Sequence, residues 1–338
     1  MKRFKSMLYV VETGKRCTSV LRRAVALAET NQANLTLVDV VPQVPAGIGM
    51  PRGGPLSADL QTALRTEHAQ ALDALAEPYR QRAEIQCKVL VGTPYLEVIR
   101  EVLREGHDLV IKAPEDPSWL ALLFGSNDMH LLRKCPCPIC ITKCDAPTAF
   151  RRILAAVDLA DDDPTEGSRA HRSLSHQILE VAAWMALTEL AELHLVTVWE
   201  AIGEGVMRSA SINVQAQEVF AYVEAVRRQH EAGLDALLHA LEDTLGPEAL
   251  TLLKPRKHLI RGAPSKEIPA QAKRLEADLV VMGTVGRSGI PGLLIGNTAE
   301  TILYQLDCSV LAIKPPGFVS PVSIEPSPQT SPPTPGPT

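Results

Sequence analysis

Two segments of the sequence combine residue types and spacing that could do chemistry, and the first is rich in glycine. The segment GTVGRSGIPGLLIGNT contains Gly283, Gly286, Gly296, Asn297 and Thr298. Glycines let backbone N–H groups approach an oxygen closely, and the N-terminus of a following helix favours an anion. The spacing G-x2-G-x9-G-N-T differs from a Walker P-loop and from G-x-G-x2-G. The segment therefore predicts a binding site for the phosphate of a ligand.

The second segment, CPCPICITKC, holds Cys135, Cys137, Cys140 and Cys144, four of the seven cysteines. Its spacing is not the paired C-x2-C of a structural zinc site, although cysteines this close could still reach one metal. On an extended strand the side chains of Cys137 and Cys140 point to opposite faces, which disfavours a shared metal. We interpret 137–143 as a strand with buried structural cysteines, and keep a metal or redox role as the alternative.

Other patterns of reactive residues are weak. The nine histidines are scattered, and the spacing of His171 and His176 does not suit two ligands of one metal. The acidic run 161–163 favours a solvated loop over a cation site. No Ser, Cys or His lies in a recognisable nucleophile motif. The sequence therefore predicts neither catalytic nor metal-binding residues, and we expect a protein that is not an enzyme.

Composition limits the class of protein. The chain has 338 residues, of which 46% are hydrophobic and 22% charged, the balance of a soluble globular protein. A net charge of -5 argues against a protein that coats nucleic acid. The first residues lack the apolar core of a signal peptide, and no uncharged stretch approaches the ~20 apolar residues of a membrane span. We expect a cytoplasmic protein whose cysteines are all thiols, with neither nucleic acid nor membrane as partner.

The chain contains an internal duplication. The segment ANLTLVDVV aligns without a gap with AELHLVTVW, and CPICITK aligns with CSVLAIK. Between these pairs, Gly92 and Pro94 recur at a constant spacing as Gly262 and Pro264. Each half of the chain therefore repeats the same order of strands and helices.

Short apolar runs rich in Val, Ile and Leu alternate with helical patterns in each half. Such runs are typical of strands buried on both faces, and their alternation with helices favours an open parallel sheet, which binds ligands at the carboxyl ends of its strands. The sequence thus predicts an α/β protein of two tandem Rossmann-like domains, each a five-stranded parallel sheet with helices on both faces. We place the domains at 1–145 and 146–318, and expect a disordered Pro-rich tail at 319–338.

These features resemble the universal stress protein family in its tandem two-domain, E-type form. The resemblance rests on ILAAVD, on the loop GTVGRSGIPGLLIGNTAE and on the closing CSVLAIK, and covers roughly 5–145 and 150–316. It implies a cytoplasmic stress-response protein with a five-stranded parallel sheet in each half. It also implies that the last strands of the two halves pair with each other, and it leaves a homodimer of whole chains open.

Some members of the family bind ATP, so the resemblance implies roles for single residues in the second half. Asp158 matches the acid that contacts the ribose or the adenine. Ala156 and Val157 would line the adenine beside it. Val198 matches a position whose backbone forms hydrogen bonds with the base.

The same resemblance extends to the glycine-rich segment. Met282 and Gly283 would lie along the ribose. The phosphates, with or without Mg²⁺, would contact Gly286, Gly296, Asn297 and Thr298. ATP-binding members usually have Ser or Thr where this chain has Asn297, whose longer side chain can still donate to a phosphate. The implied ligand is therefore a nucleotide, ATP or AMP.

The first half departs from this pattern. Ala113 and Asp116 stand in place of Gly283 and Gly286. The residues around them are Pro114, Glu115 and Pro117. Proline offers no N–H group to a phosphate, and carboxylates repel it. We expect the first half to be a scaffold or a partner-binding domain that holds no ATP.

We therefore hypothesise a non-catalytic stress protein that senses a nucleotide at one site in its second half. The main alternative is an interaction or scaffold protein that binds no ATP, or binds a different ligand. An ATPase is the least favoured hypothesis, because the loop carries no general base or metal-binding carboxylate. The sequence identifies neither the stress nor a protein partner.

Overall fold

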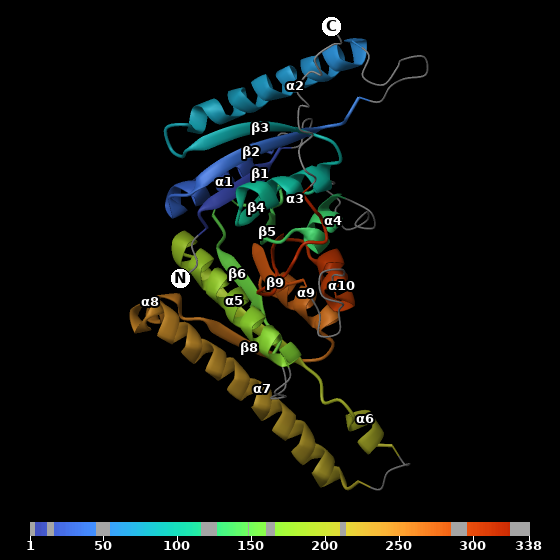
Figure 1. Cartoon of the computed structure of the whole chain (residues 1–338). Helices are drawn as coiled ribbons and strands as arrows, with labels where there is room; N and C mark the ends of the chain where they lie inside the picture. Colours follow the sequence, from blue (N-terminus) through green and yellow to red (C-terminus); the bar gives the residue numbers. More distant parts are fainter. Residues whose placement is uncertain are drawn as a thin grey trace.

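The computed structural model describes residues 4–11, 17–44, 55–115, 127–147, 149–159, 166–209, 214–284 and 296–324. Within them the chain forms one ten-stranded sheet with helices on both faces (Figure 1). The strand order is β3-β2-β1-β4-β5-β10-β9-β6-β7-β8, so the second half repeats the order of the first. Figure 1 shows α2 and α7 at opposite ends of the molecule.

The described residues of the first half form five parallel strands and four α-helices. The strands are β1 (Ser6–Val10), β2 (Asn34–Val41), β3 (Ile85–Val91), β4 (Leu109–Lys112) and β5 (Ile139–Ile141). The helices are α1 (Thr18–Asn31), α2 (Pro55–Ala76), α3 (Pro94–Glu105) and α4 (Asn127–Lys134), with the 3-10 helix η1 (Glu77–Tyr79) after α2.

The described residues of the second half form five further parallel strands and six α-helices. The strands are β6 (Arg152–Ala156), β7 (Glu192–Trp199), β8 (Arg256–Arg261), β9 (Leu279–Gly283) and β10 (Ser309–Ile313). The helices are α5 (Glu166–Glu189), α6 (Glu204–Met207), α7 (Ala216–Leu245), α8 (Pro247–Leu253), α9 (Pro264–Arg274) and α10 (Asn297–Gln305).

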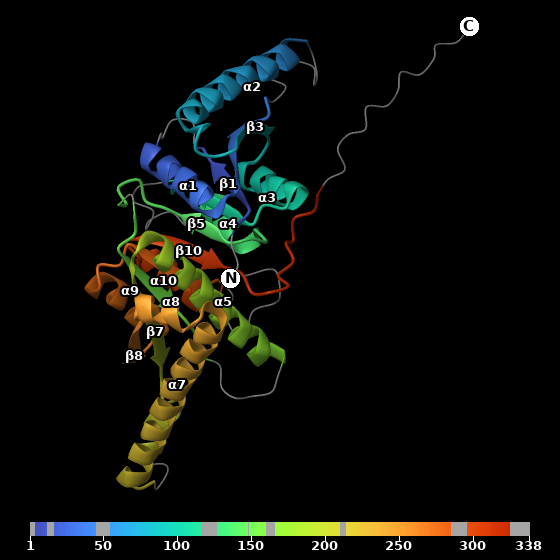
Figure 2. The same cartoon turned by 90° about the vertical axis from the view of Figure 1, so that its left-hand side faces the viewer.

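The two halves meet where their last strands pair. β5 and β10 run antiparallel, with Cys140 opposite Leu311, and Figure 2 shows them side by side in the middle of the molecule. The five-stranded parallel sheet of each half and the pairing of the last strands are both confirmed. β5 begins two residues later than the predicted strand 137–143, because Pro138 has no N–H group for the ladder, and it ends two residues earlier, at Ile141.

Alternate residues of β1 pack into two cores, one on each face of the sheet. Met7 and Tyr9 belong to the core that includes residues of α1 and α5. Leu8 and Val10 belong to the core that includes residues of α3, α4, α9 and α10. Because helices cover both faces, the central strands have no polar face, which explains their continuous apolar runs.

Arg23 of α1 contacts Pro147 and Phe150, which lie in the linker between the two halves, and it also contacts α5. Its buried guanidinium forms an ion pair with Glu189 at 2.8 Å and lies 3.5 Å from the ring centroid of Phe150. It also donates to the carbonyl of Pro147, while the backbone N–H of Phe150 donates to Glu189. Burial raises the pKa of Glu189, and the charge of Arg23 opposes that rise. The linker between the halves therefore contacts α1 of the first half and α5 of the second half.

The tail begins with contacts to the first half. The Ser320 hydroxyl donates to the carbonyl of Lys134 at 2.7 Å, and Val322 packs against the core beneath α4. Residues beyond 324 lie outside the described part, so disorder there stays a prediction, as do the domain limits at 145 and 318. Within the described parts of the chain, no helix has both the length and the apolar character that crossing a bilayer requires.

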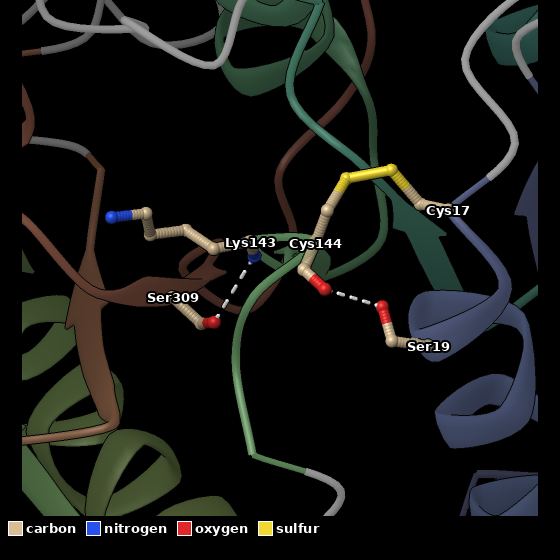
Figure 3. Close-up of a disulfide and its surroundings, with 5 residues drawn as sticks. All are labelled: Cys17, Ser19, Lys143, Cys144 and Ser309. Atoms are coloured by element: carbon tan, nitrogen blue, oxygen red, sulfur yellow. Dashed lines mark hydrogen bonds between the residues drawn. A yellow bond between two sulfur atoms is a disulfide. The ribbon is translucent and has the colours of Figure 1, made fainter.

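The expectation that every cysteine is a thiol is wrong for two of them. Cys17, at the start of α1, and Cys144, after β5, form a disulfide with 5.4 Å between their Cα atoms (Figure 3). The Ser19 hydroxyl also donates to the carbonyl of Cys144 at 2.6 Å. The two cysteines are 127 residues apart, so only the packing of α1 beside the linker brings them together.

The other cysteines of CPCPICITKC are buried, as interpreted from the sequence. Cys135, Cys137 and Cys140 are free and almost fully covered. Cys137 packs into one core and Cys140 into the other, which confirms that their side chains lie on opposite faces of the sheet. Among the described residues, no group of three or more His, Cys, Asp or Glu side chains is arranged to hold a metal ion.

His194 of β7 and His258 of β8 form a histidine pair. The Gln271 amide donates to His258 Nδ1 at 3.1 Å, and His258 Nε2 lies 2.9 Å from His194 Nδ1. This chain of hydrogen bonds requires both imidazoles to be neutral, with the proton of His258 on Nε2. Burial lowers the pKa of both His194 and His258.

Loss of the disulfide is expected to destabilise the chain. Cys17→Ser and Cys144→Ser should each lower the free energy of unfolding by about 2–4 kcal/mol, because the long loop that the bond closes is no longer constrained in the unfolded state. Urea unfolding followed by tryptophan fluorescence measures this. The double variant Cys17→Ser, Cys144→Ser should be no less stable than the less stable of the two single variants, since all three variants lack the same bond. Cys87→Ser is the control. Equal stability of the wild type with and without reductant would contradict a formed disulfide.

The histidine pair predicts loss of stability in mild acid. The unfolded imidazoles bind protons below about pH 6.5, whereas the folded ones resist protonation, so stability falls as pH drops from 6.5 towards their lowered pKa values. Each histidine that stays neutral contributes a slope of up to about 1.4 kcal/mol per pH unit. Urea midpoints between pH 7.5 and 5 measure the slope, which should be shallower in His258→Gln. An unchanged slope in that variant would contradict the assignment.

Candidate functional site

The parallel strands of the second half bring the residues of the expected ligand site to one edge of the sheet. β6 ends at Ala156, opposite Met282 of β9, and β7 ends one residue after Val198. Asp158 follows β6, with Val157 between, and Gly283 ends β9. Because β6, β7 and β9 are parallel, their carboxyl ends form one edge. The structure therefore brings these residues together, while their roles stay a prediction.

The start of α10 lies at the same edge. The backbone N–H of Gly296 donates to the carbonyl of Thr284 at 3.0 Å, which holds the start of α10 against the end of β9. Gly296 is the N-cap residue, and the first turn of α10 has no side-chain cap. Asn297 and Thr298 are exposed there. An anion could bind this uncapped first turn. Gly286 lies outside the described residues.

α5 fixes the ends of β6 and β9 from one face of the sheet. The buried hydroxyl of Ser175 donates to the carbonyl of Asp158 at 2.6 Å, whereas the side chain of Asp158 is exposed. A Cβ atom on Gly283 would lie 2.8 Å from Leu174 Cδ2 and would have to displace the end of that side chain. The close packing of α5 therefore favours a glycine at position 283 whether or not a ligand binds.

Thr284 is a candidate that sequence reasoning missed. Its side chain is fully buried, and its hydroxyl has no hydrogen-bond partner within the described parts of the chain. A buried polar group without a partner costs about 1–3 kcal/mol. The sequence feature that could have identified Thr284 is its position directly after β9, at the start of the glycine-rich segment. An unpaired hydroxyl at this edge fits a polar ligand.

At the same edge of the first half, charged side chains pair with one another and with the start of α4. Lys112 aligns with Met282, ends β4 and forms a buried ion pair with Asp128 of α4. Asp128 also accepts the backbone N–H of Glu115 at 2.9 Å. The Glu115 carboxylate in turn accepts the backbone and side-chain N–H groups of Asn127, at 3.2 and 2.5 Å. A carboxylate therefore occupies the N-terminus of α4.

A pocket remains beside this network in the first half. It has a volume of about 370 Å³, and its lining includes Asp39 and His68, which pair at 2.6 Å. The sequence predicted that the acids here would repel a phosphate. The Glu115 carboxylate also competes directly with a phosphate, because it already binds the N-terminus of α4 to which a phosphate would have to bind. Asp116 and Pro117 lie outside the described residues.

Comparison with known proteins identifies the family. The family model described as the universal stress protein family matches residues 3–143 and 149–314. The chain belongs to the universal stress protein family. Because the model matches twice, once in each half, this universal stress protein is a tandem member with two domains, as the resemblance implied.

The similar proteins have the same tandem length. Universal stress protein E of Escherichia coli (strain K12) is 30% identical over 336 residues, which cover 96% of this chain and 98% of that protein. The universal stress protein E homolog of Haemophilus influenzae is 28% identical and covers 93% and 98%. A functionally unknown protein from Pseudomonas aeruginosa PAO1 has a solved structure with a TM-score of 0.67, 27% identity and coverage of 92% and 93%. These likenesses support a role in the stress response.

The buried ion pair of the first half predicts a non-additive effect on stability. Asp128→Ala should lower the free energy of unfolding by about 3–5 kcal/mol, because it removes the carboxylate that forms the ion pair with the buried Lys112 ammonium. The double variant Lys112→Met, Asp128→Thr introduces the residues at the equivalent positions of the second half, and should recover most of that loss. Urea unfolding of the full chain measures both. A double variant as unstable as Asp128→Ala would show that the pair does not act as one unit.

Proposed function

We propose that this universal stress protein binds a nucleotide, ATP or AMP, at one non-catalytic site in its second half. The observation that carries the proposal is the meeting of three features at one edge of the sheet: Asp158, the end of β9 and the uncapped N-terminus of α10. A nucleotide needs an apolar wall for its base, a polar group for its ribose and an anion site for its phosphates. Groups of all three kinds lie at this edge.

Each part of the nucleotide has a proposed partner. Ala156 and Val157 are buried apolar residues beside the edge and would contact the base, with the backbone of Val198 as its hydrogen-bond partner. Asp158 would accept a ribose hydroxyl, and Met282 would lie along the sugar. Gly283 would also lie along the sugar, and the phosphates would contact Gly286, Gly296, Asn297 and Thr298. A Mg²⁺ ion would arrive with the phosphates, because the described side chains hold no group of three metal ligands.

We propose a single site because the two halves differ in charge at the start of the equivalent helices. α10 begins with an uncapped turn, whereas the N-terminus of α4 already binds the Glu115 carboxylate. A phosphate in the first half would have to displace that carboxylate. It would also have to lie next to Asp128, which is held by Lys112. The first half would then serve as a scaffold or a partner-binding domain.

The site is proposed to bind and not to turn over its ligand. Asp158 is the acidic side chain placed at the described part of the edge, and its proposed partner is the ribose, far from the terminal phosphate. The alternative remains an interaction protein that binds no ATP, and Asn297 favours it because its side chain fills more of the phosphate position than Ser or Thr. We infer a cytoplasmic protein, and further pairing of whole chains stays a prediction of the sequence.

Calorimetric titration of ATP with Mg²⁺ into the full chain tests the proposal. We expect about one nucleotide per chain in the wild type. Asp158→Ala should weaken binding by about tenfold or more, because a charge-assisted hydrogen bond to the ribose is lost. Glu248→Ala removes an exposed acid of α8, at a distance from the site, and should bind as the wild type does.

The stoichiometry and the turnover separate the hypotheses. Two nucleotides per chain would contradict the proposal that the first half binds none. No binding of ATP or AMP would favour the interaction protein. Release of phosphate under excess Mg-ATP that Asp158→Ala abolishes would favour an ATPase.

A further inference from the structure

Cys135 and Cys137 form a pair of thiols directly before β5. Their Sγ atoms lie 3.6 Å apart. A disulfide requires about 2.05 Å between the sulfur atoms, so rotation of the side chains with a small backbone shift would bring them into bonding range. Cys140 is the second residue of β5, and its sulfur atom instead contacts the hydroxyl of Thr142 at 3.3 Å. The pair therefore differs in geometry from the neighbouring cysteine.

One thiol of the pair reaches a cavity at the junction of the two halves. Cys135 is 0% exposed and Cys137 is 7% exposed. Cys137 lines a cavity of about 660 Å³, whose other walls come from the end of α3 and the residues before β4, from α5 and from the segment that follows β10. A cavity of this volume is large enough to hold a small molecule beside Cys137.

The cavity wall offers hydrogen bonds to a small polar molecule. His107 is buried, its Nδ1 lies 2.8 Å from the Ser6 hydroxyl, and its Nε2 has no partner among the described residues. The Oε1 atom of Gln177 has no partner there either. Burial lowers the pKa of His107, which keeps its imidazole neutral. Both side chains line the cavity with Cys137.

A buried ammonium lies beside the thiols. Lys314 follows β10 and is almost fully buried, and its Nζ atom donates to the carbonyls of Leu132 and Arg133 at the end of α4. It also lies 4.7 Å from the ring centroid of Phe318. The positive charge is therefore held at the C-terminus of α4, directly before Cys135, where the helix dipole favours a cation.

The charges of the cluster favour one thiolate shared by the pair. Burial raises the pKa of Cys135, but hydrogen bonds from the thiol and backbone of Cys137, together with the charge of Lys314, outweigh it and leave that pKa below its ordinary value. The hydrogen bond to Cys135 and burial raise the pKa of Cys137. Burial lowers the pKa of Lys314 to about 8, and the charges of the two cysteines oppose that fall. By contrast, burial raises the pKa of both Cys140 and Cys308.

We propose that Cys135 and Cys137 are a dithiol site that hydrogen peroxide, entering the junction cavity, oxidises to a disulfide. The thiolate of the pair attacks one peroxide oxygen, the O–O bond breaks, and the leaving hydroxide takes up a proton to form water. The second sulfur then attacks the resulting sulfenic acid. The S–S bond forms, the S–O bond breaks, and the oxygen leaves with the remaining thiol proton as a second water. The two sulfurs lose two electrons, which the peroxide gains.

Oxidation would change the junction between the halves. A disulfide carries no charge, so a thiolate of the pair would no longer oppose the positive charge of Lys314, which links the end of β10 to the end of α4. The site is separate from the nucleotide residues and does not rest on the proposed function. It is also separate from the Cys17–Cys144 disulfide, which joins α1 to the linker.

Mass spectrometry of the full chain after treatment with hydrogen peroxide tests the proposal. Trypsin releases the peptide CPCPICITK, which carries Cys135, Cys137 and Cys140 and separates them from Cys144. After alkylation under native conditions and digestion, this peptide should lack the mass of two hydrogen atoms and carry the bond between Cys135 and Cys137. Dithiothreitol should reverse the change. The bond should form at least about tenfold faster than Cys308 is oxidised, because Cys308 is a solitary buried thiol.

Matched variants separate the dithiol from general thiol oxidation. Cys140→Ser should keep the reaction, and Cys135→Ser and Cys137→Ser should each abolish it. Lys314→Met keeps a long side chain without the charge and should slow the reaction by about tenfold, whereas Lys314→Arg should retain most of the rate. Far-UV circular dichroism checks that each variant is folded. A wild type that forms no Cys135–Cys137 bond, or forms it only after unfolding in urea, would overturn the proposal.

Discussion

The antiparallel pairing of β5 with β10 is the constraint on which the rest of the molecule depends. Each half alone would expose the edge of its last strand, with unpaired N–H and C=O groups. The pairing removes both edges and makes two sheets into one of ten strands. Because the strands run in opposite directions, the end of β10 lies beside the start of β5. That is why Lys314, Cys135 and the junction cavity lie together.

Duplication allowed the two halves to use the same edge of the sheet differently. In the second half the edge keeps a helix without a side-chain cap and a hydroxyl, that of Thr284, with no hydrogen-bond partner among the described residues. In the first half Lys112, Asp128 and Glu115 satisfy one another and the helix. A charged cluster that pairs internally avoids the large cost of leaving a single charge buried. The two halves therefore differ in what their side chains do at this edge: in the first half a carboxylate already binds the start of the helix, and in the second half no side chain caps it.

The sequence predicted features that depend on short segments, but it did not predict contacts between side chains far apart along the chain. The strands of both halves followed from continuous apolar runs, and the convergence of Asp158 with Gly283 followed from parallel strand order. The hydrogen bonds from Glu115 to the start of α4 did not follow, because charge alone predicts repulsion of phosphate and not the partner that the carboxylate finds. The buried ion pair of Arg23 with Glu189 gave no signal, since its two helices lie in different halves.

The sequence by itself determined the duplication, the α/β class, the order of elements and the family resemblance, because these depend on local apolar periodicity and on motifs within short segments. Tertiary structure alone decided which distant side chains meet. It placed Cys17 against Cys144, Lys314 against the end of α4, and Leu174 against Gly283. Such contacts arise from the packing of helices on a twisted sheet, which brings residues together irrespective of their separation along the chain.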